Sequence, residues 1–295
     1  MSETKKLHIE NVYKSYGDKL VLDNVDLSVS KGDFCTLVGP SGCGKSTLLR
    51  LILGQEVSDS GSICIDGDAV GVPDVNRGIV FQRYSLYPHL TVLENVLLGK
   101  YISKKSWFMP WKAAKKDHEE AMHYLTILRL QDAIAKYPHE LSGGMQQRVA
   151  IAQALIMKPP ILLMDEPFGA LDPDTREELQ LFILELWEKE ELTIFFVTHD
   201  LVEACYLGSR LLVLSQYYTD DRGNKSDVKR GGKIVADHSL QRVASSTEVK
   251  NSKPFQDLIL SVRNDGFDPQ IMQHVKDFNL KHPDSFYTLT KEEHG

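Results

Sequence analysis

The sequence lacks any apolar run that approaches the roughly 20 residues of a membrane-spanning helix, and residues 1–6 include no hydrophobic signal region. If the protein acts at a membrane, other chains must therefore supply the membrane-spanning segments. Its four cysteines, Cys35, Cys43, Cys64 and Cys205, have neither disulfide nor metal-ligand spacing, which fits a reducing cytoplasm. The net charge is −7, which argues against a nucleic-acid-binding body.

The 295 residues include neither internal repeats nor low-complexity tracts. With 42% hydrophobic and 25% charged residues, the chain is long enough for one large core and an appendage. Short alternating segments at 7–29 and 61–67 predict an antiparallel sheet. Residues 93–157 are rich in helical patterns, and residues 177–190 predict a long amphipathic helix.

A glycine-rich loop lies between a buried strand at 34–38 and a helix at 46–53. Its glycines let the backbone curl so that successive N–H groups and the positive end of the helix face a phosphate. Lys45 adds a mobile cation for the β- and γ-phosphates, and the hydroxyl of Ser46 can bind Mg²⁺. The flanking strand and helix argue against the alternative, an ordinary glycine-rich turn.

Cys43 lies within this loop. A thiol close to a helix N-terminus and to Lys45 is expected to have a lowered pKa and to alkylate readily. The alternative is that Cys43 fills a small space in a tight loop and that its sulfur is inaccessible.

The apolar run 161–164 predicts a strand buried on both faces of a parallel sheet, and Asp165 and Glu166 follow it. Open α/β sheets bind their ligands at the carboxyl ends of the strands. Adjacent side chains on a strand point in opposite directions, so the two carboxylates are expected to have different roles. A solvated pair of carboxylates at a strand end is the alternative.

Further polar groups lie at the ends of predicted elements. His199 ends a second apolar run at 193–198, although an isolated histidine is more often structural than catalytic. Gln82 follows a shorter strand-like run. A third group precedes a helical pattern and presents a helix N-terminus to an anion; its members are Ser142, Gly143 and Gly144.

Taken in chain order, these features resemble the ATP-binding cassette (ABC) ATPases: the glycine-rich loop, Gln82, the segment 141–148, Asp165 with Glu166, Asp172 and His199. The resemblance covers roughly residues 7–214. It implies an α/β fold, a P-loop NTPase (RecA-like) core with a parallel sheet, a flanking antiparallel β subdomain and an α-helical signature subdomain at about 93–157.

Two domains are expected from this resemblance. Residues 1–244 would form the nucleotide-binding domain, and residues 245–295 a short helical C-terminal extension. Within the extension, segments 255–262 and 271–278 predict two short helices, which are expected to strap the core.

The resemblance also implies a role for each motif in the hydrolysis of MgATP to ADP and phosphate. Glu166 would be the general base, His199 the γ-phosphate sensor, and Gln82 a contact to Mg²⁺ and the attacking water. Ser46, Gln82 and Asp165 would hold Mg²⁺. Tyr16 would stack on adenine, with Tyr13 as a nearby alternative. The expected nucleotide-binding residues are Tyr16, Gly39, Pro40, Ser41, Gly42, Cys43, Gly44, Lys45, Ser46, Thr47, Ser142, Gly143, Gly144 and Asp172.

A shared active site is expected, because one chain cannot easily cap the same phosphate with both of its helix ends. In the family, two copies pair head to tail, and each signature segment closes over the ATP of the other copy. Asp172 lies in the loop that corresponds to the family's dimer contact. Transmembrane permease subunits would bind near residues 84–90, with a solute-binding protein as an indirect partner and no nucleic acid. This places the chain as a peripheral subunit on the cytoplasmic face of the inner membrane.

Met145 and several other positions resemble the ATPases of nitrate, sulfonate, taurine and bicarbonate importers, whereas Gln153 replaces the arginine that relatives usually carry. A small anion or organic solute of that type is the expected cargo. The alternatives are the ATPase of an exporter or lipid transporter, and a soluble ABC ATPase without membrane subunits. Two regions exceed a minimal cassette. One is the aromatic insertion at 104–112, which could touch a membrane or a partner or pack locally, and the other is the tail at 245–295, which the polar hairpin at 217–232 precedes.

Overall fold

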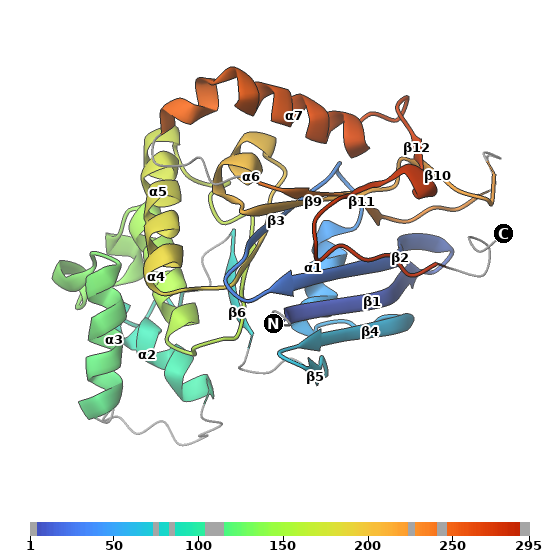
Figure 1. Cartoon of the computed structure of the whole chain (residues 1–295). Coiled ribbons are helices and arrows are strands. Elements are labelled where there is room, and N and C mark those ends of the chain that lie inside the picture. Colours follow the sequence, from blue (N-terminus) through green and yellow to red (C-terminus); the bar gives the residue numbers. More distant parts are fainter. Residues whose placement is uncertain are drawn as a thin grey trace. The chain divides into compact units, whose positions relative to one another are not determined.

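The computed structural model describes residues 5–72, 77–82, 86–103, 115–223, 228–240 and 247–289 (Figure 1). The chain forms two compact units: Met1–Val72 with Trp187–Gly295, and Pro73–Leu186. The aromatic insertion at 104–112 lies outside the described residues, as does Tyr84. Among the described residues, none of the helices is both long and apolar enough to cross a membrane.

An antiparallel sheet in the first unit has the strand order β2-β1-β4-β5. It consists of β1 (Lys5–Tyr16), β2 (Lys19–Ser30), β4 (Ser60–Ile65) and β5 (Asp68–Ala69). Leu7, Ile9 and Val12 of β1 are fully buried, so one face of the sheet packs into the core. The antiparallel sheet predicted from the alternating segments is therefore confirmed, and Figure 1 shows β1, β2 and β4 side by side.

A second set of strands in the same unit centres on β3 (Phe34–Val38), which is buried along its whole length. It pairs in parallel with β8 (Ile194–Val197) and β9 (Arg210–Ser215), and β11 (Lys233–Ser239) pairs antiparallel with β9. Helix α1 (Lys45–Leu53) follows β3 in the chain, and helix α6 (Leu201–Leu207) contacts β3. The predicted strand at 34–38 and the helix after it are thus confirmed.

The C-terminal segment of the first unit is only partly helical. A turn η3 (Thr247–Asn251) leads into α7 (Lys253–Gly266), which contacts α6, β9 and β11 and confirms the first predicted helix. The second predicted helix, at 271–278, is wrong. This stretch forms β12 (Gln273–His274), the single turn η4 (Val275–Asp277) and then β13 (Asn279–Leu280), because β10 (Tyr218–Thr219) and β11 each offer an edge for parallel pairing.

The second unit carries the helices predicted between residues 93 and 157. These are α2 (Val92–Ser103), α3 (Lys115–Ile127) and α4 (Gly143–Leu155), with the short turns η1 (Gln131–Ala133) and η2 (Pro138–Glu140). Strands β6 (Gly78–Phe81) and β7 (Leu162–Asp165) pair in parallel, and the long helix α5 (Pro173–Lys189) begins after β7. The three helices contact one another, and α4 also contacts β6.

Candidate nucleotide site

The phosphate loop between β3 and α1 owes its shape to glycine. Gly42 (φ 78°) and Gly44 (φ 108°) adopt left-handed conformations that residues with a Cβ rarely reach. Gly39 touches β9 so closely that a Cβ there would lie 2.0 Å from the carbonyl oxygen of Leu214. Helix α1 starts directly after Gly44, and the Leu48 N–H donates to the Gly44 carbonyl over 2.8 Å. The loop therefore presents the start of a helix, the arrangement that binds phosphate.

The ammonium group of Lys45 is held inside this loop. It donates to the carbonyl oxygens of Gly39 (2.7 Å) and Pro40 (3.1 Å), and the side chain is 9% exposed. The two carbonyl acceptors are neutral, so an incoming phosphate can replace these contacts with a stronger one in which both partners are charged. Ser46, the next residue, is exposed.

Cys43 departs from the reactive thiol expected from its neighbours. Burial raises the pKa of the Cys43 thiol, although Lys45 (Nζ to Sγ, 3.9 Å) and backbone hydrogen bonds lower it in part. The residue is 1% exposed, and its sulfur would lie 2.9 Å from a Cβ on Gly39. The prediction of a lowered pKa is wrong because desolvation outweighs the nearby cation. Cys43 instead fills the space behind the loop.

Tyr16 is the more accessible of the two candidate adenine contacts. Its side chain is 43% exposed, whereas Tyr13 is half-buried and pairs with Ser60 in the sheet. The Tyr16 hydroxyl donates to Glu56 and accepts from Arg50 (3.3 Å), and these contacts hold the ring in place. This combination leaves an anchored aromatic surface open to solvent.

His199 emerges at the same sheet edge as the phosphate loop. Strands β3 and β8 are parallel with Leu37 opposite Val197, and the Thr198 N–H donates to the Leu37 carbonyl over 3.2 Å. His199 follows Thr198 and is exposed, and Gly39 follows Val38 on the neighbouring strand and is buried. Asp200 then caps α6 by accepting from the N–H groups of residues 202 and 203. The cap fixes the turn that carries the histidine.

In the second unit, the two carboxylates and Gln82 share one edge of the strand pair. Phe81 lies opposite Asp165 in the β6–β7 register, so Gln82 and Glu166 follow neighbouring positions. The Gln82 amide nitrogen would lie 2.8 Å from a Cβ on Gly169, which places it against the loop after Glu166. Glu166 has a left-handed backbone (φ 46°), unusual for a residue with a side chain. A left-handed residue at a strand end turns the chain sharply and breaks the simple alternation of side chains.

Ser142 and Asp172 both act as helix caps. The Ser142 hydroxyl accepts from the Met145 N–H (3.3 Å) at the start of α4, and Ser142 is exposed. Asp172 accepts from the Thr175 N–H (3.0 Å) at the start of α5, and this hydrogen bond lowers the pKa of its carboxyl. Gly144 is buried, and a Cβ there would lie 2.6 Å from Thr175. The signature segment (residues 141–148) thus presents the N-terminus of α4 with an exposed Ser142 as its cap.

The residues predicted to bind a metal suit Mg²⁺ by the chemistry of their donor atoms. The candidate ligands Ser46, Gln82 and Asp165 all offer oxygen atoms. Few protein oxygen ligands, completed by substrate phosphates and water, are the usual environment of Mg²⁺.

The motif pattern does not predict that Gly232 touches the phosphate loop or that Gly231 touches β2. A Cβ on Gly232 would lie 2.0 Å from the carbonyl oxygen of Cys43, and one on Gly231 would lie 2.7 Å from the Val21 backbone. The glycine pair itself is the only signal in the sequence for this close approach.

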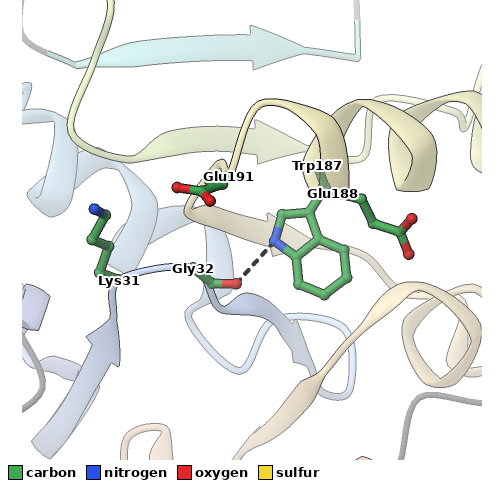
Figure 2. Close-up of a pocket in the computed structure, with 5 residues that line it drawn as sticks. All are labelled: Lys31, Gly32, Trp187, Glu188 and Glu191. Atoms are coloured by element: carbon green, nitrogen blue, oxygen red, sulfur yellow. Dashed lines mark hydrogen bonds between the residues drawn. The ribbon is translucent and has the colours of Figure 1, made fainter.

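A cavity of about 420 Å³ lies away from the phosphate loop (Figure 2). It is lined by Lys31, Gly32, Trp187, Glu188 and Glu191. The Trp187 indole donates to the Gly32 carbonyl over 3.0 Å, and Gly32 precedes β3. The cavity is therefore at the amino end of β3, whereas the phosphate loop follows its carboxyl end.

Comparisons with known proteins agree with this geometry. A family model described as "ABC transporter" matches residues 22–169. The chain is 43% identical over 208 residues to the "Aliphatic sulfonates import ATP-binding protein SsuB" of Bacillus anthracis, which covers 69% of this chain and 77% of that protein. It is 37% identical over 280 residues to the "Sulfate/thiosulfate import ATP-binding protein CysA" of Pectobacterium atrosepticum, with 92% and 84% covered.

A similar solved structure is a dimeric post-hydrolysis state of the ATP-binding cassette MJ0796 bound to ADP and Pi. Its TM-score is 0.62 at 31% identity, with 80% of this chain and 99% of that chain covered. These matches confirm the predicted P-loop NTPase fold.

Proposed function

Because the chain belongs to the ABC transporter family of ATPases, we propose that it is the subunit that hydrolyses MgATP to power a membrane importer of a small oxyanion or organic anion. The observation that supports this function most strongly is the phosphate loop. Its glycine-shaped backbone, the enclosed ammonium of Lys45 and the start of α1 converge on one point, and His199 emerges beside it. An anion with several phosphates is the ligand that such a loop recognises.

Each motif has a proposed task in hydrolysis. Lys45 and the loop N–H groups bind the β- and γ-phosphates, and Tyr16 supports the adenine. Glu166 orients the attacking water and accepts its proton, Gln82 positions the same water, and His199 contacts the γ-phosphate. When bound, Mg²⁺ neutralises charge on the phosphate oxygens, with Ser46, Gln82 and Asp165 as its protein contacts. Positioning and charge stabilisation provide most of the rate enhancement in such a site.

A second copy of the chain completes each site in this proposal. The exposed Ser142 cap, Gly143 and Gly144 would close over ATP bound to the partner, and Asp172 would contact the partner nearby. Mixing Ser142→Arg chains with Lys45→Ala chains tests this arrangement. A head-to-tail dimer then has one doubly defective site and one intact site, so doubly tagged heterodimers should trap one ATP. Trapping of no ATP by confirmed heterodimers would contradict the shared site.

The membrane partner is proposed to bind around residues 86–90, where Tyr87 is 44% exposed. Aromatic and apolar side chains on a surface suit a groove for a partner helix. The double variant Tyr87→Asp and Leu90→Asp should leave basal ATPase activity of the isolated subunit intact while preventing co-purification of the permease. A collapsed thermal unfolding transition would instead mean that these side chains support the fold. This binding would place the subunit on the cytoplasmic face of the inner membrane.

The cargo and the direction of transport need the whole complex. The two relatives are named for sulfonates, sulfate and thiosulfate, all of them sulfur oxyanions, which is why an oxyanion is proposed here. A solute-binding protein would select the cargo, and identifying its bound ligand would name it. In proteoliposomes with the ATPase facing the medium, added ATP should drive labelled solute out of the lumen. Accumulation of solute in the lumen would identify an exporter.

A further inference from the structure

The polar hairpin between β9 and β11 contains a network of buried charges. Asp220 is 4% exposed and accepts from Arg222 Nε (2.9 Å) and from Arg230 (3.0 Å). Arg222 also donates to Asp23 of β2 over 2.6 Å, and Asp23 is 3% exposed. The fully buried Tyr218 donates its hydroxyl proton to the same Asp23 carboxylate over 2.6 Å. The partly exposed guanidinium groups of Arg222 and Arg230 thus compensate two buried carboxylates, as buried charges require.

The segment after Arg230 connects this network to the phosphate loop. Gly232 forms a bridge with Leu22 of β2: its N–H donates to the Val21 carbonyl (2.7 Å), and its carbonyl accepts from the Asp23 N–H (3.0 Å). As described above, both glycines approach so closely that a Cβ would collide with the loop or with β2. Gly44 of the loop also lies against Leu22. The back of the phosphate loop therefore rests on Gly232 and β2.

The C-terminal segment covers the other side of the network. Phe278 packs edge-on against Tyr218 (5.9 Å between ring centroids), and β12 pairs with β10 at Tyr218. The Tyr287 hydroxyl accepts from Lys233 over 3.3 Å, and the Lys233 ammonium lies 5.8 Å from the Tyr218 ring. Three layers follow one another in space: the C-terminal segment, the buried charges and the phosphate loop.

A glycine-rich loop needs such support. Glycine gains access to left-handed conformations at the cost of a larger loss of backbone entropy on ordering. A loop that is already ordered before nucleotide arrives binds more tightly, because the apparent Kd rises as the competent fraction of molecules falls.

We propose that the ion network of Asp23, Asp220, Arg222 and Arg230 positions the phosphate loop through Gly231 and Gly232, so that these charged groups are positioning residues for nucleotide. The inference rests on the proposed binding of ATP at this loop. It makes the hairpin a determinant of ATP affinity rather than of the chemical step.

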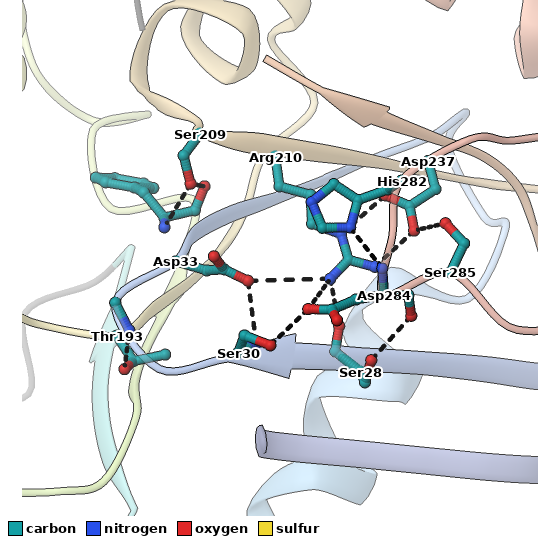
Figure 3. Close-up of polar contacts among 12 residues, drawn as sticks. Ser28, Ser30, Asp33, Thr193, Ser209, Arg210, Asp237, His282, Asp284 and Ser285 are labelled. Carbon is teal, nitrogen blue, oxygen red and sulfur yellow. Dashed lines mark hydrogen bonds and ion pairs between the residues drawn. The ribbon is translucent and has the colours of Figure 1, made fainter. Parts of the chain in front are cut away.

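A comparison of two networks in the same unit tests this. The test variant is Arg230→Met, which keeps the aliphatic stem and removes the guanidinium, with Arg230→Lys to restore the charge. The control variant is Asp284→Asn in the network around Arg210 (Figure 3). There Asp284 lies 3.7 Å from Arg210. In the β3–β9 register Arg210 lies opposite Cys35, close to the amino end of β3, whereas the phosphate loop follows the carboxyl end.

We expect Arg230→Met to raise the Kd for ATP and the KM about tenfold, as if the competent loop were populated in roughly one molecule in ten. The kcat at saturating ATP should stay within about twofold, and Arg230→Lys should recover most of the affinity. Amide hydrogen exchange at residues 39–45 should become faster in the nucleotide-free variant. Asp284→Asn should change none of these quantities, even where it lowers the thermal unfolding midpoint.

Unchanged ATP affinity and unchanged exchange at the loop in Arg230→Met would overturn the inference, as would equal effects of Asp284→Asn. Should Arg230→Met fail to fold, Tyr218→Phe removes the hydroxyl that donates to Asp23 and accepts from Arg222, and it is judged by the same two measurements. Failure of the wild-type protein to bind ATP would refute the proposed function instead. Exchange at the nucleotide-free loop would then still decide the inference.

Discussion

Replacing Gly39 with alanine should destabilise the protein more than replacing Gly42, although both glycines lie in the phosphate loop. A Cβ on Gly39 would lie 2.0 Å from the Leu214 carbonyl oxygen, whereas ordinary contact begins at 3.4 Å, so one side must move by about 1.4 Å. Leu214 is fully buried in β9, which pairs with β3 on one side and with β11 on the other. The strand is held in place, so the loop must move.

Gly42 presents a different obstacle. It has no atom within 4 Å of the position of a Cβ, but its φ of 78° is left-handed. That conformation costs a residue with a Cβ roughly 1–2 kcal/mol. Alanine also lowers the conformational entropy of the unfolded chain, which stabilises the folded protein by about 0.4–1 kcal/mol. We therefore expect a net loss of about 1 kcal/mol for Gly42→Ala. Overpacking at Gly39 should cost about 3 kcal/mol, the upper end of the usual range, because the strand cannot yield.

Thermal unfolding of the nucleotide-free subunit distinguishes the two variants. At about 2–4 °C per kcal/mol, Gly42→Ala should lower the midpoint by about 2–4 °C and Gly39→Ala by about 6–12 °C. Gly42→Asn is the matched control, because asparagine tolerates left-handed backbone and should lose less than Gly42→Ala. Equal unfolding midpoints for Gly39→Ala and Gly42→Ala would refute the predicted steric clash between a Cβ on Gly39 and the Leu214 carbonyl.

Four further outcomes follow from the same structure. Glu166→Gln should retain ATP binding and lose about 10²–10⁴-fold in turnover; near-normal hydrolysis would exclude it as the general base. Tyr16→Ala should weaken ATP binding by about 1–3 kcal/mol in calorimetry while Tyr16→Phe stays close to wild type, and equal loss in both would exclude stacking. In the nucleotide-free protein, maleimide should label the half-buried Cys64 before the buried Cys43, whose raised pKa keeps the thiol protonated at neutral pH. Burial and Arg210 lower the pKa of His282 from 6.5. The contribution of His282 to the free energy of unfolding is therefore fully present above pH 6.5, and it is lost on acidification because the unfolded chain binds the proton first. Denaturant titrations of His282→Gln should show a smaller loss of stability below pH 6.5.

Local chemistry explains which parts of the site can be predicted from the sequence. The glycine-rich loop, the buried strand before it and the helix after it are short-range features, so residues 34–53 predict the structure that is found. Ser142 and Asp200 precede helices as caps, which is equally a short-range property. In each case the residues that decide the structure lie within about a turn of one another.

Contacts between distant parts of the chain explain the errors. The expected pKa of Cys43 counts two neighbours in sequence, Lys45 and the helix start, but the burial that reverses it comes from β9 and Gly232. The segment 271–278 has a plausible helical pattern, yet β10 lies 52 residues before it and offers an edge that no local pattern reveals. The sequence of the polar hairpin likewise gives no sign that Asp220 is buried or that Arg222 forms an ion pair with Asp23 of β2.

This division has a consequence for how variants of the protein should behave. In the proposed mechanism, motif residues such as Glu166 act on the reacting phosphate, so their replacement should change kcat. Supporting residues such as Arg230 act on the fraction of molecules whose loop is ready for nucleotide, so their replacement should change KM and leave kcat at saturation. These supporting residues act through long-range contacts and belong to no sequence motif. The phosphate loop that they position is, by contrast, easily recognised in the sequence. In this proposal, the strength of ATP binding depends in part on residues that resemble an ordinary polar hairpin.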